Sequence, residues 1–213
     1  MREKFQEEID NLMNQVRNMG VQLEETLDRC IDNVIDKNVD IANSIIAKDD
    51  DFDNADRKIE QLCLNLLIRQ TPVAKDLREI ASCLKLVGDL ERIADHCSDF
   101  SMYTIRLAEK PQIELPPCFF AMLRTMRSMV YDSITAISEM DAALAQSVID
   151  EDDIVDDCFV EIRNQLTIMM QAEPSVVPQC VDYLMISKYA ERVADHATNI
   201  AEWVLYIIRN ELK

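Results

Sequence analysis

Glycine and proline are scarce in this chain. Among its 213 residues there are only two glycines and six prolines, so it lacks the turn residues that a sandwich or barrel of short strands requires. Leu, Ile, Ala, Met and Asp are plentiful instead. The composition argues against an all-β fold and predicts an all-α protein.

Long apolar runs are also missing. The uninterrupted hydrophobic stretches are only a few residues long, whereas a helix needs about 20 apolar residues to cross a bilayer. The N-terminal sequence MREKFQEEID contains no apolar signal region. We therefore expect a chain that has no transmembrane segment and stays in the cytoplasm.

Positive charge is in deficit. The chain has 22 Lys and Arg residues against 40 Asp and Glu residues, for a net charge of −18. Contacts to a phosphate backbone need clustered Lys and Arg, so we expect no nucleic-acid partner and favour cations as ligands. The seven cysteines show no CxxC and no regular spacing, which is typical of core thiols in a reducing compartment.

The prolines mark the joints between helices, because proline breaks a helix interior. Helical spacing of apolar residues predicts three helices before the linker KPQIELPP, which spans 110–117, and three after it. We expect two tandem, pseudo-symmetric three-helix bundles, residues 1–110 and 111–213. The expected helices cover about 5–47, 48–69, 73–109, 117–147, 150–171 and 175–210.

One short motif occurs in both halves. ERIADH at 91–96 and ERVADH at 191–196 lie 100 residues apart and contain the only two histidines. On a helical wheel, Glu91 and Asp95 continue an apolar stripe, and Glu191 and Asp195 do the same in the second half. An unpaired carboxylate on a buried face costs several kcal/mol. These acids must therefore be protonated, paired with a cation or bound to metal.

A second acidic row on the preceding helix of each half favours metal. Carboxylate oxygens suit hard or borderline cations such as magnesium, manganese or iron. The second half has Asn199 where the first half has Asp99, so the second site has one negative charge fewer and should bind metal more weakly. The sequence leaves open whether Asp156 or Asp157 faces the second site. The first expected site is Glu91, Asp95, Asp56 and Glu60, with Asp99 and Asp53 at its margins; the second is Glu191, Asp195, Asp157 and Glu161, with Asn199 and Asp153 at its margins.

Two other readings of these acids stay open. Acidic pairs four residues apart are common on solvated helices, so the chain could be a purely structural interaction protein. Alternatively, a carboxylate-bridged multinuclear metal enzyme, a hydrolase or an oxidoreductase, would use the same residues. No phosphate loop or nucleophile is recognisable, so we assign no catalytic residue, and we expect His96 and His196 to form interhelical contacts.

The chain resembles the PhoU family of phosphate-signalling regulators. The resemblance rests on four segments: FQEEIDNLMNQVRNMG, RQTPVAKDLREI, DLERIADHCSDF and SKYAERVADHATNIAEW. It implies two three-helix bundles whose E(D)xxxD(N) motifs hold metal ions such as iron or zinc. Glu91 with Asp95 and Glu191 with Asp195 match that motif, but the second half lacks the DLR of the first.

The same resemblance implies a function. Such a protein would be a metal-binding cytoplasmic adaptor, positioned at times at the inner face of the membrane. It would restrain phosphate uptake by a phosphate-specific ABC transporter and pass the signal to a membrane histidine kinase. We also expect it to self-associate as a homodimer.

Overall fold

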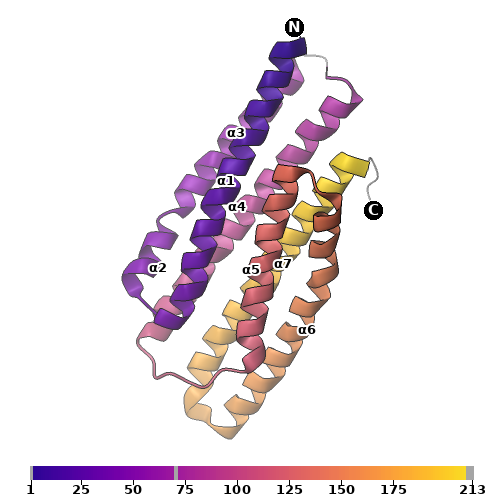
Figure 1. Cartoon of the computed structure of the whole chain (residues 1–213). Helices are drawn as coiled ribbons and strands as arrows, with labels where there is room; N and C mark the ends of the chain where they lie inside the picture. Colours follow the sequence, from indigo (N-terminus) through magenta and orange to yellow (C-terminus); the bar gives the residue numbers. More distant parts are fainter. Residues whose placement is uncertain (1, 70–71, 210–213) are drawn as a thin grey trace.

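The computed structural model describes residues 2–69 and 72–209 (Figure 1). Over this part of the chain the secondary structure is helical and contains no strand, which confirms the expected all-α class. The elements are α1 (Arg2–Asp36), α2 (Val39–Ile46), α3 (Asp49–Arg69), α4 (Ala74–Ala108), α5 (Pro117–Glu139), α6 (Ala142–Ala172), a short 3₁₀ helix η1 (Pro174–Val176) and α7 (Val177–Arg209).

The first helix is shorter than the sequence predicts. Lys37 takes a left-handed conformation with φ of 50°, and Asn38 then caps α2 by accepting from the amides of Asp40 and Ile41. This turn breaks the expected helix 5–47 into α1 and α2. The break has no glycine signal, because a lysine occupies the left-handed position.

The predicted helix over 117–147 is also wrong, because a left-handed turn interrupts it. Met140 has φ of 52° and ends α5, and Asp141 caps α6 through the amides of Ala143 and Leu144. The acidic run at 150–153 therefore lies inside α6 and does not start a helix. Because α6 begins earlier than predicted, the register of its acids had to be established from the structure.

The two turns define how the halves correspond. Lys37 and Met140 are 103 residues apart, and so are their following caps Asn38 and Asp141. The two histidine motifs are only 100 residues apart. The second half therefore has three residues fewer between its second long helix and its motif, and a residue of α3 corresponds to the residue 103 positions later in α6.

Helices α4 and α7 lie at the centre of the molecule. In Figure 1, α1–α4 form one group and α5–α7 a second group beside it, with the linker at one end of the molecule. Helix α4 packs against α1, α2 and α3, α7 packs against α5 and α6, and α4 and α7 pack against each other. Leu90 of α4 and Val193 of α7 are fully buried in one core shared by both groups.

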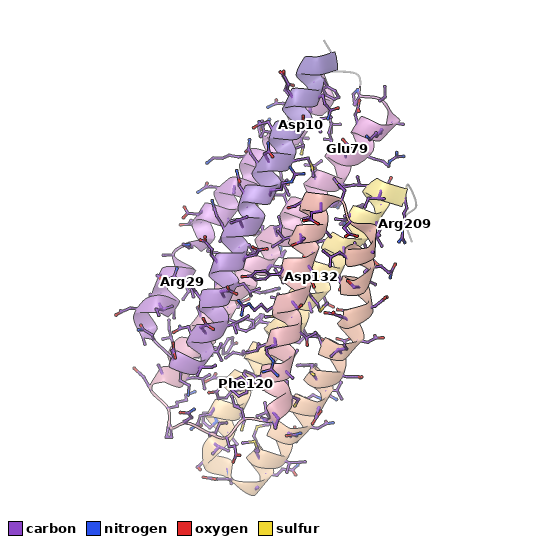
Figure 2. The ribbon with its side chains drawn as sticks, viewed as in Figure 1. Asp10, Arg29, Glu79, Phe120, Asp132 and Arg209 are labelled. Atoms are coloured by element: carbon purple, nitrogen blue, oxygen red, sulfur yellow. The ribbon has the colours of Figure 1, made fainter. Side chains whose placement is uncertain are left out.

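Helices α1 and α5 make a second contact between the groups. An added Cβ on Gly20 would lie 2.8 Å from Cγ2 of Ile134, so the missing side chain permits the close approach. Polar side chains project from the outer faces, for example Arg29 near α2 and Arg209 at the end of α7 (Figure 2). None of the helices described has an apolar stretch long enough to cross a membrane.

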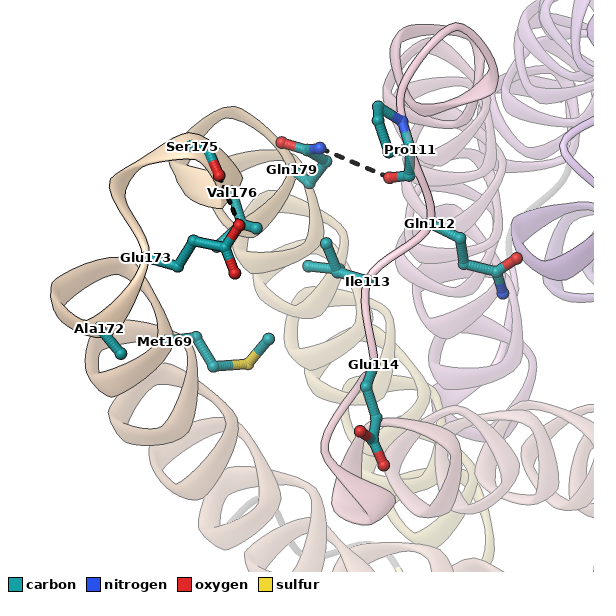
Figure 3. A pocket seen from close by; sticks show the side chains of 10 residues that line it. All are labelled: Pro111, Gln112, Ile113, Glu114, Met169, Ala172, Glu173, Ser175, Val176 and Gln179. Atoms are coloured by element: carbon teal, nitrogen blue, oxygen red, sulfur yellow. Dashed lines mark hydrogen bonds between the residues drawn. The ribbon is translucent and has the colours of Figure 1, made fainter.

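The linker is fastened to the start of α7. Gln179 Nε2 donates to the carbonyl of Pro111 over 3.4 Å (Figure 3), and Lys110 forms an ion pair with the buried Asp182. Beside this contact lies a partly open cavity of about 610 Å³, bordered by Ile113 and Met169. The expected metal residues lie elsewhere, between α3 and α4 and between α6 and α7.

Candidate metal centre

A groove between α3 and α4 collects the acids of the first half. The two helices pack side by side, so the acidic positions of α3 face those of α4. The groove has a volume of about 360 Å³ and is open to solvent. Its lining residues are Asp56, Glu60, Leu84, Lys85, Gly88, Asp89, Glu91 and Arg92.

Glu91 is the most perturbed carboxyl of this groove. Burial, together with the charges of the nearby Asp95, Asp56 and Asp53 and against the opposing charge of Arg92, raises the pKa of Glu91 to about 7. Burial and the charge of Glu60 raise the pKa of Asp56. The buried Oδ1 of Asp56 accepts no hydrogen bond from the part of the chain described. The structure thus brings Asp56, Glu91 and Asp95 together and leaves their negative charge incompletely compensated.

Asp49 is a residue that the sequence reasoning missed. Burial and the charge of Asp95 raise the pKa of Asp49. Asp49 therefore lies against the α4 acids one turn before Asp53. Its spacing of four residues from Asp53 was the available signal, but the sequence was used there only to start the predicted helix over 48–69.

The cations of the first groove lie on its rim. Arg92 Nη1 is 2.7 Å from Asp95 Oδ2, and Arg92 Nε is 3.4 Å from Glu91 Oε2. The Arg92 side chain is 59 % exposed. Arg57 likewise pairs with Asp53 over 2.8 Å and is mostly exposed. Ion pairs on exposed side chains are weak because water screens them, so these arginines neutralise the groove only in part.

Asp99 and Asn199 lie at the contact between α4 and α7. Asp99 Oδ2 is 3.3 Å from Nδ1 of His96, and Asn199 Nδ2 donates to Asp89 over 3.3 Å. His196 Nδ1 is 2.8 Å from the same Asp89 oxygen, and the rings of His96 and His196 are 5.7 Å apart between centroids. The histidines make the expected interhelical contacts. Asp99 and Asn199 take part in this interface, so they do not support the expectation that the second site binds metal more weakly than the first.

In the second half, Asp152 and Asp156 face the motif of α7. Burial and the charge of Glu191 raise the pKa of Asp156, and burial, Glu191 and Asp156 raise the pKa of Asp195. Asp152 accepts a hydrogen bond from Thr198 over 3.2 Å. These two residues are 103 positions after Asp49 and Asp53 of α3, as the helix correspondence requires.

The expected register of the second site is therefore corrected by one residue. Asp156 and Asp157 are both exposed, but Asp156 lies close enough to Glu191 for that charge, after burial, to raise its pKa. Glu161 accepts from Gln165 over 2.7 Å and lies toward α5, where burial and then the charge of Glu161 raise the pKa of Cys118. Asp153 is exposed beside Asp152. The physical reason is the helical rotation of about 100° between successive residues.

The donor chemistry of the first groove fits a cation. Half-buried carboxylates that repel one another, and a carboxylate oxygen without a hydrogen bond, are groups that hard cations bind through oxygen. As placed, no three Asp, Glu, His or Cys side chains of residues 2–69 and 72–209 surround a common point closely enough to hold an ion. The metal and its ligand set therefore stay a prediction, with Asp56, Glu91 and Asp95 as its centre.

Comparisons with known proteins agree with this architecture. The sequence model described as the PhoU domain matches residues 16–104 and 120–204. The chain is 32 % identical to the phosphate-specific transport system accessory protein PhoU homolog of Clostridium acetobutylicum, covering 97 % of this chain and 95 % of that protein. It is 30 % identical to the homolog so named of Pseudomonas aeruginosa, covering 97 % of this chain and 86 % of that protein.

Solved structures show the same fold. The crystal structure of PhoU from Pseudomonas aeruginosa superposes with a TM-score of 0.92 at 30 % identity, covering 97 % of this chain and 100 % of that one. The phosphate transport system regulatory protein PhoU from Streptococcus pneumoniae gives a TM-score of 0.91 at 27 % identity, covering 98 % and 99 %. On sequence and on fold, over nearly its whole length, this chain belongs to the PhoU family.

Proposed function

We propose that this protein is an accessory regulator of phosphate transport. The observation that carries the proposal is the match to relatives named as accessory proteins of the phosphate-specific transport system, which covers 97 % of this chain. In finer terms, the protein is a cytoplasmic adaptor that restrains uptake by a phosphate-specific ABC transporter. It docks on the cytoplasmic components of the transporter and relays phosphate status to a membrane histidine kinase.

Metal binding is the second part of the proposal. Asp56, Glu91 and Asp95 would hold the ion, with Asp49 and Asp53 close by; manganese, magnesium, iron or zinc are the candidate metals. The bound ion would supply positive charge to the groove. The chain's own acids would then fasten α3 to α4, because carboxylates that repel one another without the ion become partners of a common charge.

The role of the ion in this proposal is structural. Residues of both helix groups meet at the α4–α7 contact, so a rigid α3–α4 pair would help to fix the surface that the adaptor presents. We propose no catalytic turnover, since the acids of the groove are assigned to the ion and no separate general base is assigned. Hydrolysis of a phosphate monoester by the manganese-loaded protein above the rate of free manganese would contradict this.

Affinity capture from cells tests the regulatory function. The tagged chain should recover the transporter ATPase and its membrane subunits from phosphate-replete cells after mild crosslinking. Deleting the gene should raise phosphate uptake, and the wild-type gene should restore it. Failure to recover any transporter subunit, together with unchanged uptake in the deletion strain, would refute the proposal. Size-exclusion chromatography with light scattering tests the expected homodimer.

A further inference from the structure

The residues that line the groove of the first half differ from their counterparts in the second half at five positions. Asp56 and Glu60 of α3 correspond to Phe159 and Arg163 of α6, each 103 residues later. Within the repeated motif segments, which are 100 residues apart, Gly88 corresponds to Lys188. Two further lining residues differ as well, since Lys85 corresponds to Met185 and Asp89 to Tyr189. At the places where the first half forms its groove, the second half therefore has three carboxylates fewer, and it has Arg163 and Lys188 as cationic side chains where the first half has Lys85.

Gly88 leaves the first groove open. It lines the groove beside Asp56 and Glu91, and a Cβ added to it would meet nothing within 4 Å. The empty space is therefore large enough to begin a side chain without disturbing the packing. In this half the cationic side chains that line the groove are Lys85 and Arg92, and both are largely exposed to solvent.

Lys188 occupies the equivalent space in the second half. Its ammonium forms an ion pair with Glu191 and lies 5.2 Å from the ring centroid of Phe159. The charge of Lys188 acts to lower the pKa of both Asp156 and Asp195, although burial and the neighbouring carboxylates raise these pKa values by more. Arg192 is placed differently from Arg92, since its guanidinium lies over the Tyr189 ring, 5.7 Å from the centroid.

We propose that Lys188 is a tethered cation that takes, between α6 and α7, the place that a metal ion takes between α3 and α4. This inference rests on the proposed metal binding for its first half. A lysine ammonium close to three carboxylates offsets part of their negative charge and competes with a free cation for the same oxygens. The protein thus binds one ion tightly, at the first groove, and a second ion only where Lys188 is displaced.

Manganese binding to four variants tests the inference. Lys188→Met keeps most of the aliphatic length without the charge, and Lys188→Arg keeps the charge. Gly88→Lys adds the tethered charge to the first groove, and Gly88→Met is its uncharged control. Equilibrium dialysis gives the Mn²⁺ bound per chain, and paramagnetic broadening of amide signals near Ser98 or Thr198 locates each ion.

We expect that removing the lysine from the second half creates a metal site and that adding a lysine to the first half weakens one. Wild type and Lys188→Arg bind one Mn²⁺ tightly, with broadening near Ser98, and Lys188→Met gains a second site at least about tenfold tighter than the residual affinity in wild type. Gly88→Lys weakens the first site at least about tenfold, whereas Gly88→Met retains it. Two equally tight ions in wild type, or a Lys188→Met variant that binds like wild type, overturns the inference.

Thermal unfolding in a chelator separates this inference from the metal proposal. If none of the proteins binds Mn²⁺, the metal proposal fails. The tethered-cation role still requires that Lys188→Met melt below both wild type and Lys188→Arg, and that Gly88→Lys melt above Gly88→Met. Equal melting temperatures within each pair overturn it whatever the metal result.

Discussion

Replacing Glu91 with glutamine should stabilise the metal-free protein at alkaline pH. Burial beside Asp95 raises the pKa of Glu91 to about 7 from an ordinary value of 4.5. A shift of one pKa unit corresponds to about 1.4 kcal/mol, so the shift has an upper limit of about 3 kcal/mol. Because the groove is open to water and the interaction is screened, we expect about 1–2 kcal/mol.

The sign follows from proton linkage. A carboxyl whose pKa is raised by folding binds its proton more tightly in the folded chain, so stability falls as pH rises from about 4.5 to 7. Above pH 7 the ionised Glu91 destabilises the fold, and Glu91→Gln removes that penalty. Below pH 4.5 the wild-type carboxyl is protonated in both states, so the gain should vanish.

Urea unfolding in the presence of a chelator provides the measurement. Unfolding free energies of wild type and Glu91→Gln should differ by about 1–2 kcal/mol at pH 8 and converge near pH 4.5. Glu25→Gln, at an exposed position on α1, is the control and should show little difference at either pH. A Glu91→Gln variant that is less stable than wild type at pH 8, or equally changed at both pH values, would refute the reasoning.

Three further substitutions probe the fold, each by urea unfolding. Gly20→Ala should cost about 1–3 kcal/mol, because the new Cβ would lie 2.8 Å from Ile134 Cγ2; an unchanged or higher stability would show that the two helices can separate freely. Asp141→Ala should cost about 0.5–2 kcal/mol, since it removes the side-chain cap of α6, and no loss would contradict that role. Lys110→Met should cost up to about 3 kcal/mol, because it removes the closer cationic partner of the buried Asp182 and leaves Arg106 at 4.0 Å; a loss below about 1 kcal/mol would mean that Arg106 compensates the charge of Asp182.

The helical class was predictable because two physical signals agreed. Prolines at the joints and apolar spacing within the segments predicted long helices, and the linker at 110–117 follows α4 as expected. The positions of Glu91 and Asp95 within a half-buried groove also followed from periodicity, since both continue the apolar stripe of α4. Local patterns of this kind depend only on the helix repeat.

The register of the second acidic row was not predictable from the same signals. It depends on the turns at Lys37 and Met140, where residues other than glycine adopt a left-handed backbone. Left-handed turns without glycine are rare, so a sequence interpretation had no reason to end a helix there. The predicted pair Asp157 and Glu161 lies 101 residues after Asp56 and Glu60, whereas α3 and α6 correspond at 103. At that interval the counterparts of Asp49 and Asp53 are Asp152 and Asp156.

The role of Lys188 was hidden for a related reason. Its partner Glu191 is three residues away in sequence, but the Phe159 ring beneath its ammonium comes from another helix. Only the packing of α6 against α7 brings these groups together. The same holds for Asp89, which meets His196 across the α4–α7 contact.

Manganese content of the wild-type protein and of the double variant Glu91→Ala/Asp95→Ala tests the metal centre most directly. After dialysis against Mn²⁺ and removal of free metal, wild type should retain one ion per chain, and the double variant should lose it. The double variant should keep its helical circular dichroism and melt no lower than wild type in a chelator, because two mutually repelling acids have been removed. Equal manganese content in both proteins, or none in wild type, would contradict the account.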